Sequence, residues 1–465
     1  MSKFPLKKRQ YGEEAPFIPL GPFKLRIPLV HFTLKPPILL QGLFIVAVNV
    51  ASIPFMETCL PGLSYEEYLA MMLTFDVMIC VEVLLGNPTY SGYITPGIPL
   101  VIAYITSYAS ADDRVYAITA VALELTLMFL ILGCTGLADK VMKKIPDWFK
   151  GGIMYGACIS ALTSIFGKEG KLSGQWICGF AACGVLLFAT YSLRIAKKKK
   201  QHKLLSTICA QGIIVGCVVG IIVGFFTGEI KVVPMEWGIN SLAPLGSAMA
   251  KYSIFTHGVP ALKFWIWGLP TAFVDYTIAF GDFVLADSIF KECDKARDDE
   301  YIEYKPNRSN IMCGIRNLFM AFTVPSPTMA GPIWAGGCIS IGENYKEGRE
   351  RMDSIYDGMF SLILGPTICN FLKPCTSFFK PIGALGAALL LAVQGFATAV
   401  VANGYVKGKV ETGIAFAMGL AMNLQSNLAG MVVGIVLYLL LGAEEDDRRK
   451  QEKAETKKAE VSRVN

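Results

Sequence analysis

Charged residues are scarce in this chain, and histidine is almost absent. Only 17% of the 465 residues are charged and three are histidines, whereas 53% are hydrophobic. A soluble protein of this size carries roughly a quarter charged residues. The apolar residues run in blocks of about 18 to 25, the length that crosses a bilayer. The composition therefore predicts an all-α polytopic membrane protein, and the net charge of +6 gives no reason to expect a nucleic acid partner.

Motifs for several kinds of chemistry are also missing. The 13 cysteines stand singly, without a CxxC pair or a Cys/His cluster, which argues against a zinc site or a disulfide framework. The sequence contains no G-x-x-x-x-G-K-[ST] loop, no H-E-x-x-H motif and no serine nucleophile with a plausible partner. We therefore expect neither an enzyme nor an ATP-driven pump. No cofactor is expected apart from a coupling ion, Na⁺ or H⁺.

The apolar blocks predict about fourteen membrane spans in two sets of seven. The predicted spans are 37–59, 66–85, 93–109, 114–135, 149–166, 175–194, 205–226, 263–284, 309–324, 327–342, 354–371, 383–401, 411–423 and 427–442. An N-terminal segment, 1–36, precedes them, and a charged tail, 443–465, follows them. Between the two sets, 227–262 is predicted to be an external connecting segment.

Lysine and arginine concentrate in alternate loops. The run Lys197 to Lys200 and the pair Lys407 and Lys409 fall in loops predicted to be cytoplasmic, whereas the first external loop has no basic residue. This bias predicts that both termini lie in the cytoplasm. The membrane itself is predicted to be the inner or plasma membrane of the cell. Because each set has an odd number of spans, 37–226 and 263–442 are predicted to be inverted repeats.

Two apolar segments, one in each half, are interrupted by prolines. They are Tyr93 to Leu100, with prolines at 96 and 99, and Thr323 to Pro332, with prolines at 325, 327 and 332. A lipid-exposed span does not tolerate so many missing N–H groups, so such breaks occur where the backbone lines a protein cavity. Paired broken spans in two repeats indicate the binding site of a secondary transporter.

The stretch Leu269 to Gly337 resembles the second-half core of the SulP anion transporters and of the nucleobase/ascorbate transporters, which share one fold. Pro96 to Pro99 resembles the broken third span of that fold. The residues that carry the resemblance are Leu285-Ala286-Asp287, Asn307-Arg308, Ile311, Gly314-Ile315, Asn317-Leu318, Phe322, Pro325 and Ala335-Gly336-Gly337.

The resemblance implies an architecture and a mechanism. Spans one to four and eight to eleven would form a core domain that moves like an elevator against a gate domain, and the gate domain would mediate a homodimer. The substrate would lie between the N-termini of short third and tenth helices. SulP proteins usually continue into a cytoplasmic STAS domain; since only 443–465 follows the last span, a STAS domain is not expected.

A helix N-terminus carries unpaired N–H groups and a partial positive charge, so a small anion is the expected guest. Tyr93 and Thr95 would lie beside the start of the third helix, and Ser326 and Thr328 beside the start of the tenth. Asn49, in the first span, is a further candidate for the substrate site. The hydroxyls are alternatively simple helix N-caps, and Tyr93 is alternatively an interfacial aromatic.

Asp275 and Asp282 lie seven residues apart, and so on one face of the eighth span. A carboxylate at this depth normally faces a cavity, a partner or an ion. We therefore predict that they bind the coupling Na⁺ or H⁺; the alternative is a structural ion pair with Arg316. Nucleobase transporters of this fold carry glutamates at positions that fall at Ile278 and near Gly331, and both are absent here.

The sequence thus predicts a secondary-active elevator transporter of a small anion, driven by symport with Na⁺ or H⁺ and embedded in the lipid bilayer. Two alternatives remain open. One is a uracil- or xanthine-type nucleobase proton symporter on the same fold, and the other is an anion channel.

Overall fold

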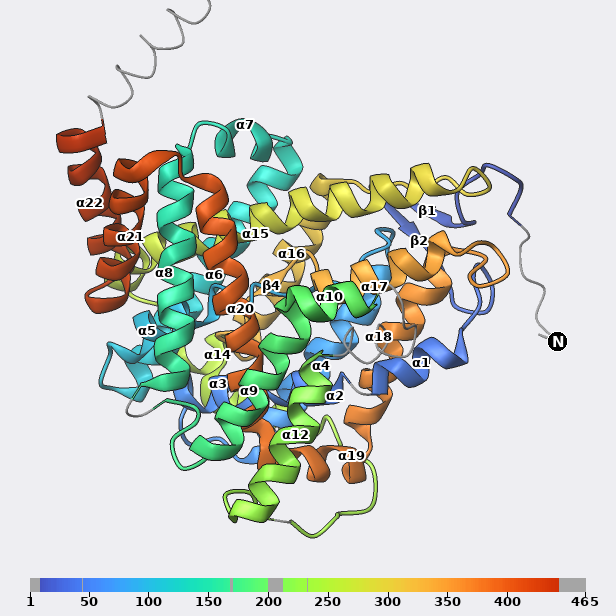
Figure 1. The fold of residues 1–465 in the computed structure, drawn as a ribbon, viewed down its shortest axis with the longest axis horizontal. Helices are drawn as coiled ribbons and strands as arrows, with labels where there is room; N and C mark the ends of the chain where they lie inside the picture. The colour runs from blue at the N-terminus through green and yellow to red at the C-terminus, as the bar shows by residue number, and fades with distance from the viewer. Residues whose placement is uncertain (1–8, 44, 168–169, 200–211, 232, 443–465) are drawn as a thin grey trace, which may run out of the picture.

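The computed structural model describes residues 9–43, 45–167, 170–199, 212–231 and 233–442, and it is mostly helical (Figure 1). The helices of the first half are α1 (Pro36–Leu43), α2 (Val46–Val50), α3 (Ile53–Cys59), α4 (Tyr65–Leu84), α5 (Ile98–Thr106), α6 (Ala111–Thr135), α7 (Ala138–Met142), α8 (Asp147–Phe166), α9 (Trp176–Tyr191), α10 (Leu193–Lys199) and α12 (Gly212–Thr227). Those of the second half are α13 (Pro244–Tyr252), α14 (Ile254–His257), α15 (Leu262–Ala296), α16 (Pro306–Phe322), α17 (Ala335–Lys346), α18 (Ile355–Phe371), α19 (Lys373–Phe379), α20 (Gly383–Tyr405), α21 (Gly408–Leu424) and α22 (Asn427–Leu437), with a 3₁₀ turn η1 (Lys380–Ile382) and a π turn η2 (Tyr438–Gly442).

Four stretches in the described part of the chain are long and apolar enough to cross a membrane. They are Ala111–Thr135, Asp147–Phe166, Leu262–Ala296 and Lys373–Tyr405, and three shorter apolar helices accompany them. The count of fourteen spans stays a prediction. The predicted tail, 443–465, and the first residues of the predicted span 205–226 lie outside the described residues.

The helices pack in two groups that each draw on both halves of the chain. In the first, which we call the α15 group, α6 packs against α15 and α16, α18 packs against α1 and α4, and α15 packs against α17. In the second, the α8 group, α8 packs against α20 and α21, and α9 packs against α12 and α20. The α8 group lies to the left and below centre in Figure 1, and α15 crosses the view in yellow. Because α15 has 35 residues, it is about 50 Å long and exceeds the thickness of a bilayer core.

The predicted span 37–59 is not one continuous helix, because the chain forms α1, α2 and α3 in succession. Glycine at position 42 lets α1 approach α18 closely, because a Cβ there would lie 2.6 Å from the carbonyl oxygen of Leu362 in α18. Pro54 lies in the first turn of α3, where its missing N–H is not needed, and so starts a new helix.

Two short strands connect the two halves of the chain. Strand β3 (Gly92–Tyr93) pairs antiparallel with β4 (Ala330–Gly331), so that Gly92 lies opposite Gly331 and Tyr93 opposite Ala330. One further bond extends the pairing, since the N–H of Ile94 donates to the carbonyl of Met329 at 2.9 Å. A Cβ at Gly331 would lie 3.0 Å from the backbone of Tyr93 and Ile94, which explains glycine at this position.

The N-terminal segment folds against the α15 group. Its strands β1 (Ile18–Leu20) and β2 (Phe23–Leu25) form a hairpin, and the N–H groups of Lys24 and Arg26 donate to carbonyls at the end of α4. The Arg26 guanidinium is fully buried and lies 4.1 Å from the ring centroid of Tyr356 in α18. The segment thus braces the ends of α4 and α18.

Candidate functional site

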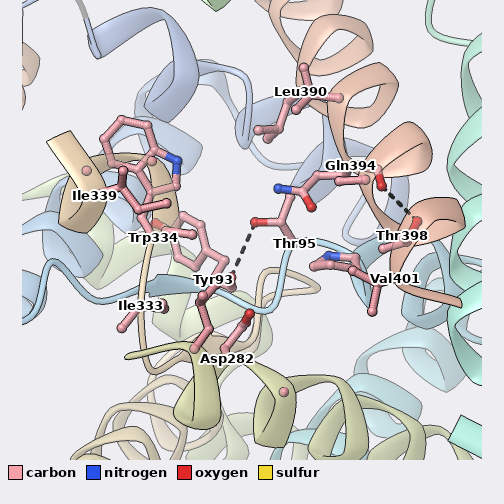
Figure 2. A pocket seen from close by; sticks show the side chains of 18 of the residues that line it. Tyr93, Thr95, Asp282, Ile333, Trp334, Ile339, Leu390, Gln394, Thr398 and Val401 are labelled. Atoms are coloured by element: carbon pink, nitrogen blue, oxygen red, sulfur yellow. Dashed lines mark hydrogen bonds between the residues drawn. The ribbon is translucent and has the colours of Figure 1, made fainter. Parts of the chain in front are cut away.

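A cavity of about 700 Å³ lies between the two helix groups. The α15 group lines it with α15 and the start of α17, and the segment before α5 adds Tyr93, Thr95 and Pro96. The α8 group lines it with α8, α9 and a face of α20. In Figure 2, Trp334 and Ile339 lie on one side of the cavity, Gln394 and Val401 on the other, and Asp282 below them.

The start of α17 presents free amide groups to this cavity. The first helical hydrogen bond runs from the N–H of Cys338 to the carbonyl of Trp334, at 3.1 Å. The N–H groups of the three residues before Cys338 therefore have no helical acceptor, and Ala335, Gly336 and Gly337 all line the cavity. Together with the helix dipole, these amides favour a negatively charged or strongly polar guest.

The chain before α5 lines the same cavity but offers no comparable donors. The N–H groups of Thr95, Gly97 and Ile98 donate to the carbonyls of the preceding turn, at 2.8, 2.9 and 3.3 Å. Pro96 and Pro99 have no N–H. The Thr95 hydroxyl donates to the Tyr93 carbonyl at 3.3 Å (Figure 2). The segment before α5 therefore offers polar groups to the cavity only through side chains. One of these groups is the Tyr93 hydroxyl, which is buried and has no hydrogen-bond partner among the described residues.

Asp275 and Asp282 occupy different surroundings on α15. Asp282 lines the cavity, is half-buried and has no ion-pair or hydrogen-bond partner among the described residues. Asp275 is 1% exposed, and within the described chain neither of its oxygens has a partner. A Cβ at Gly97 would collide with Asp275 Oδ1. Because Gly97 caps α5, the positive end of the α5 dipole lies against Asp275.

Arg316, the alternative partner of these acids, is bound elsewhere. Its Nη1 lies 2.8 Å from Glu82 Oε2, and it also donates to the carbonyls of Gly331 and Gly92. The predicted alternative, an ion pair of Arg316 with Asp275 or Asp282, is therefore wrong. The two aspartates have no basic partner in the part of the chain that the structure describes.

Three candidate substrate residues lie outside the cavity. Ser326 and Thr328 are fully buried, and their hydroxyls are hydrogen-bonded to each other at 2.7 Å. The predicted helix start near residue 327 is wrong by eight residues, since α17 begins at Ala335. Asn49 donates instead to Asp76 Oδ1 at 3.0 Å, and Asn370 donates to the other carboxylate oxygen at 2.6 Å. Tyr93 and Thr95 are the candidates that line the cavity.

The sequence analysis missed Trp334, which occupies the N-cap of α17 and lines the cavity. Its ring meets Tyr90 edge-on, with centroids 5.1 Å apart. A Cβ at Gly337 would lie 2.6 Å from the Trp334 ring and 2.9 Å from Tyr90, so glycine is required for this packing. A tryptophan directly before Ala335-Gly336-Gly337 is the signal that would have identified it.

No protein-family model matches this chain, and no curated protein matches it. Solved structures do. The transmembrane domain of a cyanobacterial bicarbonate transporter, BicA, aligns with a TM-score of 0.52 at 14% identity, over 85% of this chain and 97% of that one. The murine anion transporter Slc26a9 in the inward-facing state aligns with a TM-score of 0.54 at 13% identity, over 89% of this chain and 69% of that one. A structure of SLC26A9 aligns with a TM-score of 0.54 at 14% identity, over 88% and 65%.

These structures belong to the SLC26/SulP anion transporters. The resemblance inferred from the sequence is therefore confirmed at the level of the fold. At identities of 13% and 14%, the similarity shows the fold alone and does not identify the substrate of this chain.

Proposed function

We propose that this protein is a secondary-active membrane transporter that carries a small anion through the cavity between the α15 and α8 groups. A coupling cation, Na⁺ or H⁺, binds Asp282 in the cavity, and Asp275 behind it forms a second site for such a cation. Transport proceeds by an elevator-like displacement of one helix group against the other. The fold that this chain shares with structures of anion transporters supports the proposal.

The observation that carries the proposal is the meeting of the free α17 amides and Asp282 in one cavity. No lysine, arginine or histidine lines that cavity among the described residues. The α17 terminus supplies about half a positive charge, and an ionised Asp282 supplies one full negative charge. An anion that enters beside an unneutralised Asp282 is repelled. A cation on Asp282 removes this repulsion, so that anion and cation bind together, which is the requirement for symport.

Asp275 is proposed as a second carboxylate whose charge is neutralised by a coupling cation. It lies seven residues, or about 10 Å along the helix axis, from Asp282. A buried carboxylate without a basic partner is costly unless it binds a proton or an ion, or faces a positive dipole. The start of α5 supplies such a dipole. Because Thr95 and Pro96, next to that start, also line the cavity, occupancy of the site and the charge state of Asp275 are expected to be linked.

One observation favours a second candidate function. Asp282 shares the cavity with Tyr93 and Trp334, and a carboxylate beside aromatic side chains suits a planar heterocycle whose ring N–H groups donate to it. A nucleobase proton symporter is therefore the alternative, with Asp282 in place of the glutamate that nucleobase transporters carry one turn earlier.

The proposal is tested by uptake into proteoliposomes under an imposed Na⁺ or H⁺ gradient. The substrates are bicarbonate, chloride, short carboxylates and uracil. We expect saturable, gradient-driven anion uptake that is lost in Asp282→Asn and in Asp275→Asn. Asp287→Asn is the matched control, since Asp287 lies on the same helix outside the cavity, paired with Lys291.

Coupled uptake at the wild-type rate in both aspartate variants would exclude the assigned coupling site. Uptake of uracil alone would select the nucleobase alternative. An anion current that grows in proportion to the driving force, without saturation, would identify a channel instead.

A further inference from the structure

The cavity is larger and more apolar than an inorganic anion needs. Its volume of about 700 Å³ lies within the range of roughly 300–1,000 Å³ that is typical of sites for organic small molecules. A water molecule accounts for about 30 Å³ of liquid volume. An ion the size of a few waters would leave most of this cavity filled with solvent, and the apolar walls would gain nothing from its binding.

The apolar walls face each other across the cavity. Trp334, Ile333 and Ile339 line the side of the α15 group, and Leu390 and Val401 on α20 line the opposite side. Figure 2 shows the two sets on either side of the central space. A flat or branched apolar body held between them contacts both helix groups at once, and its burial supplies affinity that a bare ion lacks.

The charge of the cavity sets the charge of the guest. With a cation on Asp282, the remaining field is the positive end of α17, about half a charge, together with the free amides at that end. The partial positive charge and the amide donors at the start of α17 balance one carboxylate far better than two. A dianion would keep about one and a half charges without compensation in a site that lacks any basic side chain among the described residues.

The polar atoms are placed to accept such a head group. The free amides belong to Ala335, Gly336 and Gly337, of which the last two have no side chain to shield the backbone. A Cβ at Gly336 would lie 3.5 Å from the Trp334 ring, in ordinary van der Waals contact, so this glycine packs directly beside the tryptophan. The head group therefore meets amide donors beside the edge of an aromatic wall.

We infer that the substrate is an organic monocarboxylate with an apolar or aromatic body. Its carboxylate binds the N-terminus of α17, and its body lies between Trp334 and α20. This inference rests on the proposed function and specifies the substrate class of the same site.

The test is a binding measurement on the purified full chain, by thermal shift and isothermal calorimetry. The ligands are phenylacetate and butyrate, compared with bicarbonate, chloride, sulfate, succinate and uracil, each in Na⁺ and in choline buffer at two pH values. We expect saturable binding of phenylacetate and, more weakly, of butyrate, enhanced by Na⁺ or by low pH, with succinate and sulfate much weaker.

Two variants locate the binding. Trp334→Ala is expected to weaken phenylacetate on the order of tenfold, as the loss of one aromatic wall predicts. Its control is Trp267→Ala, an exposed tryptophan on the same helix group. Val401→Phe narrows the cavity from α20 and is expected to exclude phenylacetate while butyrate still binds, which keeps the test valid if Trp334→Ala fails to fold.

The outcomes separate the inference from the proposed function. Binding of bicarbonate or chloride without any monocarboxylate overturns the inference and leaves the anion transporter standing. Binding of uracil alone, without dependence on a cation, overturns both. Phenylacetate binding that is unchanged in Val401→Phe also overturns the inference, because the ligand then lies elsewhere.

Discussion

Arg316 and Glu82 form a buried ion pair at the crossing of the two short strands. Their atoms Nη1 and Oε2 are 2.8 Å apart, and the two side chains are 2% and 1% exposed. The same guanidinium donates to the carbonyl of Gly92 in β3 and to that of Gly331 in β4. One side chain from α16 therefore holds together a strand from each half of the chain, while α4 supplies its counter-charge.

Removing one charge of this pair is expected to be costly. Glu82→Gln leaves the Arg316 charge buried without compensation, which destabilises a protein by about 3–5 kcal/mol. We expect a clear fall in the melting temperature of the detergent-solubilised protein. The double variant Glu82→Gln with Arg316→Gln recovers part of the loss, because no charge remains. Asp139→Asn, which breaks an exposed pair with Lys143, serves as the control and changes stability by less than about 1 kcal/mol. An unchanged melting temperature in Glu82→Gln contradicts the pairing.

Gly337 and Gly336 form a matched pair for testing the wall of the cavity. Ala at position 337 collides with the rings of Trp334 and Tyr90, whereas Ala at 336 stays at least 3.5 Å from its neighbours. We expect Gly337→Ala to destabilise the protein by about 1–3 kcal/mol through overpacking. It should also weaken substrate binding because Trp334 moves. Gly336→Ala should melt like the wild type. Equal melting temperatures of the two variants, measured side by side, would rule out this packing.

Asp76 joins three helices through amide groups. Its carboxylate, 2% exposed, accepts from Asn49 in α2 and Asn370 in α18. Asn370→Leu leaves one carboxylate oxygen unsatisfied, and we expect a loss of about 1–3 kcal/mol. The control is Asn423→Leu, since among the described residues Asn423 makes only an exposed 3.4 Å hydrogen bond, to Thr163. In a double-mutant cycle with Asp76→Asn, the two losses should be less than additive; full additivity would show that the residues act independently.

Glu300 gives the stability a pH dependence. It lies in the loop between α15 and α16, where burial raises its pKa to about 7 despite the hydrogen bond from Ser354. Its unfolded pKa is about 4.3, so the folded chain binds more protons between these values. Stability should fall as the pH rises from about 4.3 to about 7.

The Glu300 prediction is checked with melting curves across this pH window. Glu300→Gln should melt like the wild type at the acidic end and at a higher temperature than the wild type at the alkaline end. Glu292→Gln, an exposed glutamate near the end of α15, should follow the wild type throughout. Parallel curves for Glu300→Gln and the wild type would contradict a titrating Glu300.

The arrangement of helices was largely predictable because hydropathy and prolines report it directly. Helix α4 begins at Tyr65, one residue from its predicted start, since Ser64 and Glu67 form a capping box that is visible in the sequence. The division into α1, α2 and α3 was predictable only in part. Pro54 marks the start of α3, but the contact of Gly42 near the end of α1 with α18, more than 300 residues away, has no local pattern that encodes it.

The candidate site was predictable in region but not in detail. The prolines near Thr95 and Ser326 correctly indicated irregular backbone. In the second segment, however, the chain that contains Pro325, Pro327 and Pro332 stays non-helical as far as Trp334, so the helix starts later than expected. Ser326 and Thr328 then satisfy each other instead of a ligand. Which side chains face the cavity is decided by this register, which the sequence alone does not encode.

The strand pairing between Gly92 and Gly331 has a mechanical consequence. It joins the segment before α5 to the segment before α17 by backbone hydrogen bonds. A movement that keeps these hydrogen bonds therefore displaces the starts of both helices as one rigid unit. In the elevator-type transport proposed above, both helix starts would therefore cross the membrane barrier together with the bound substrate, and neither would move alone.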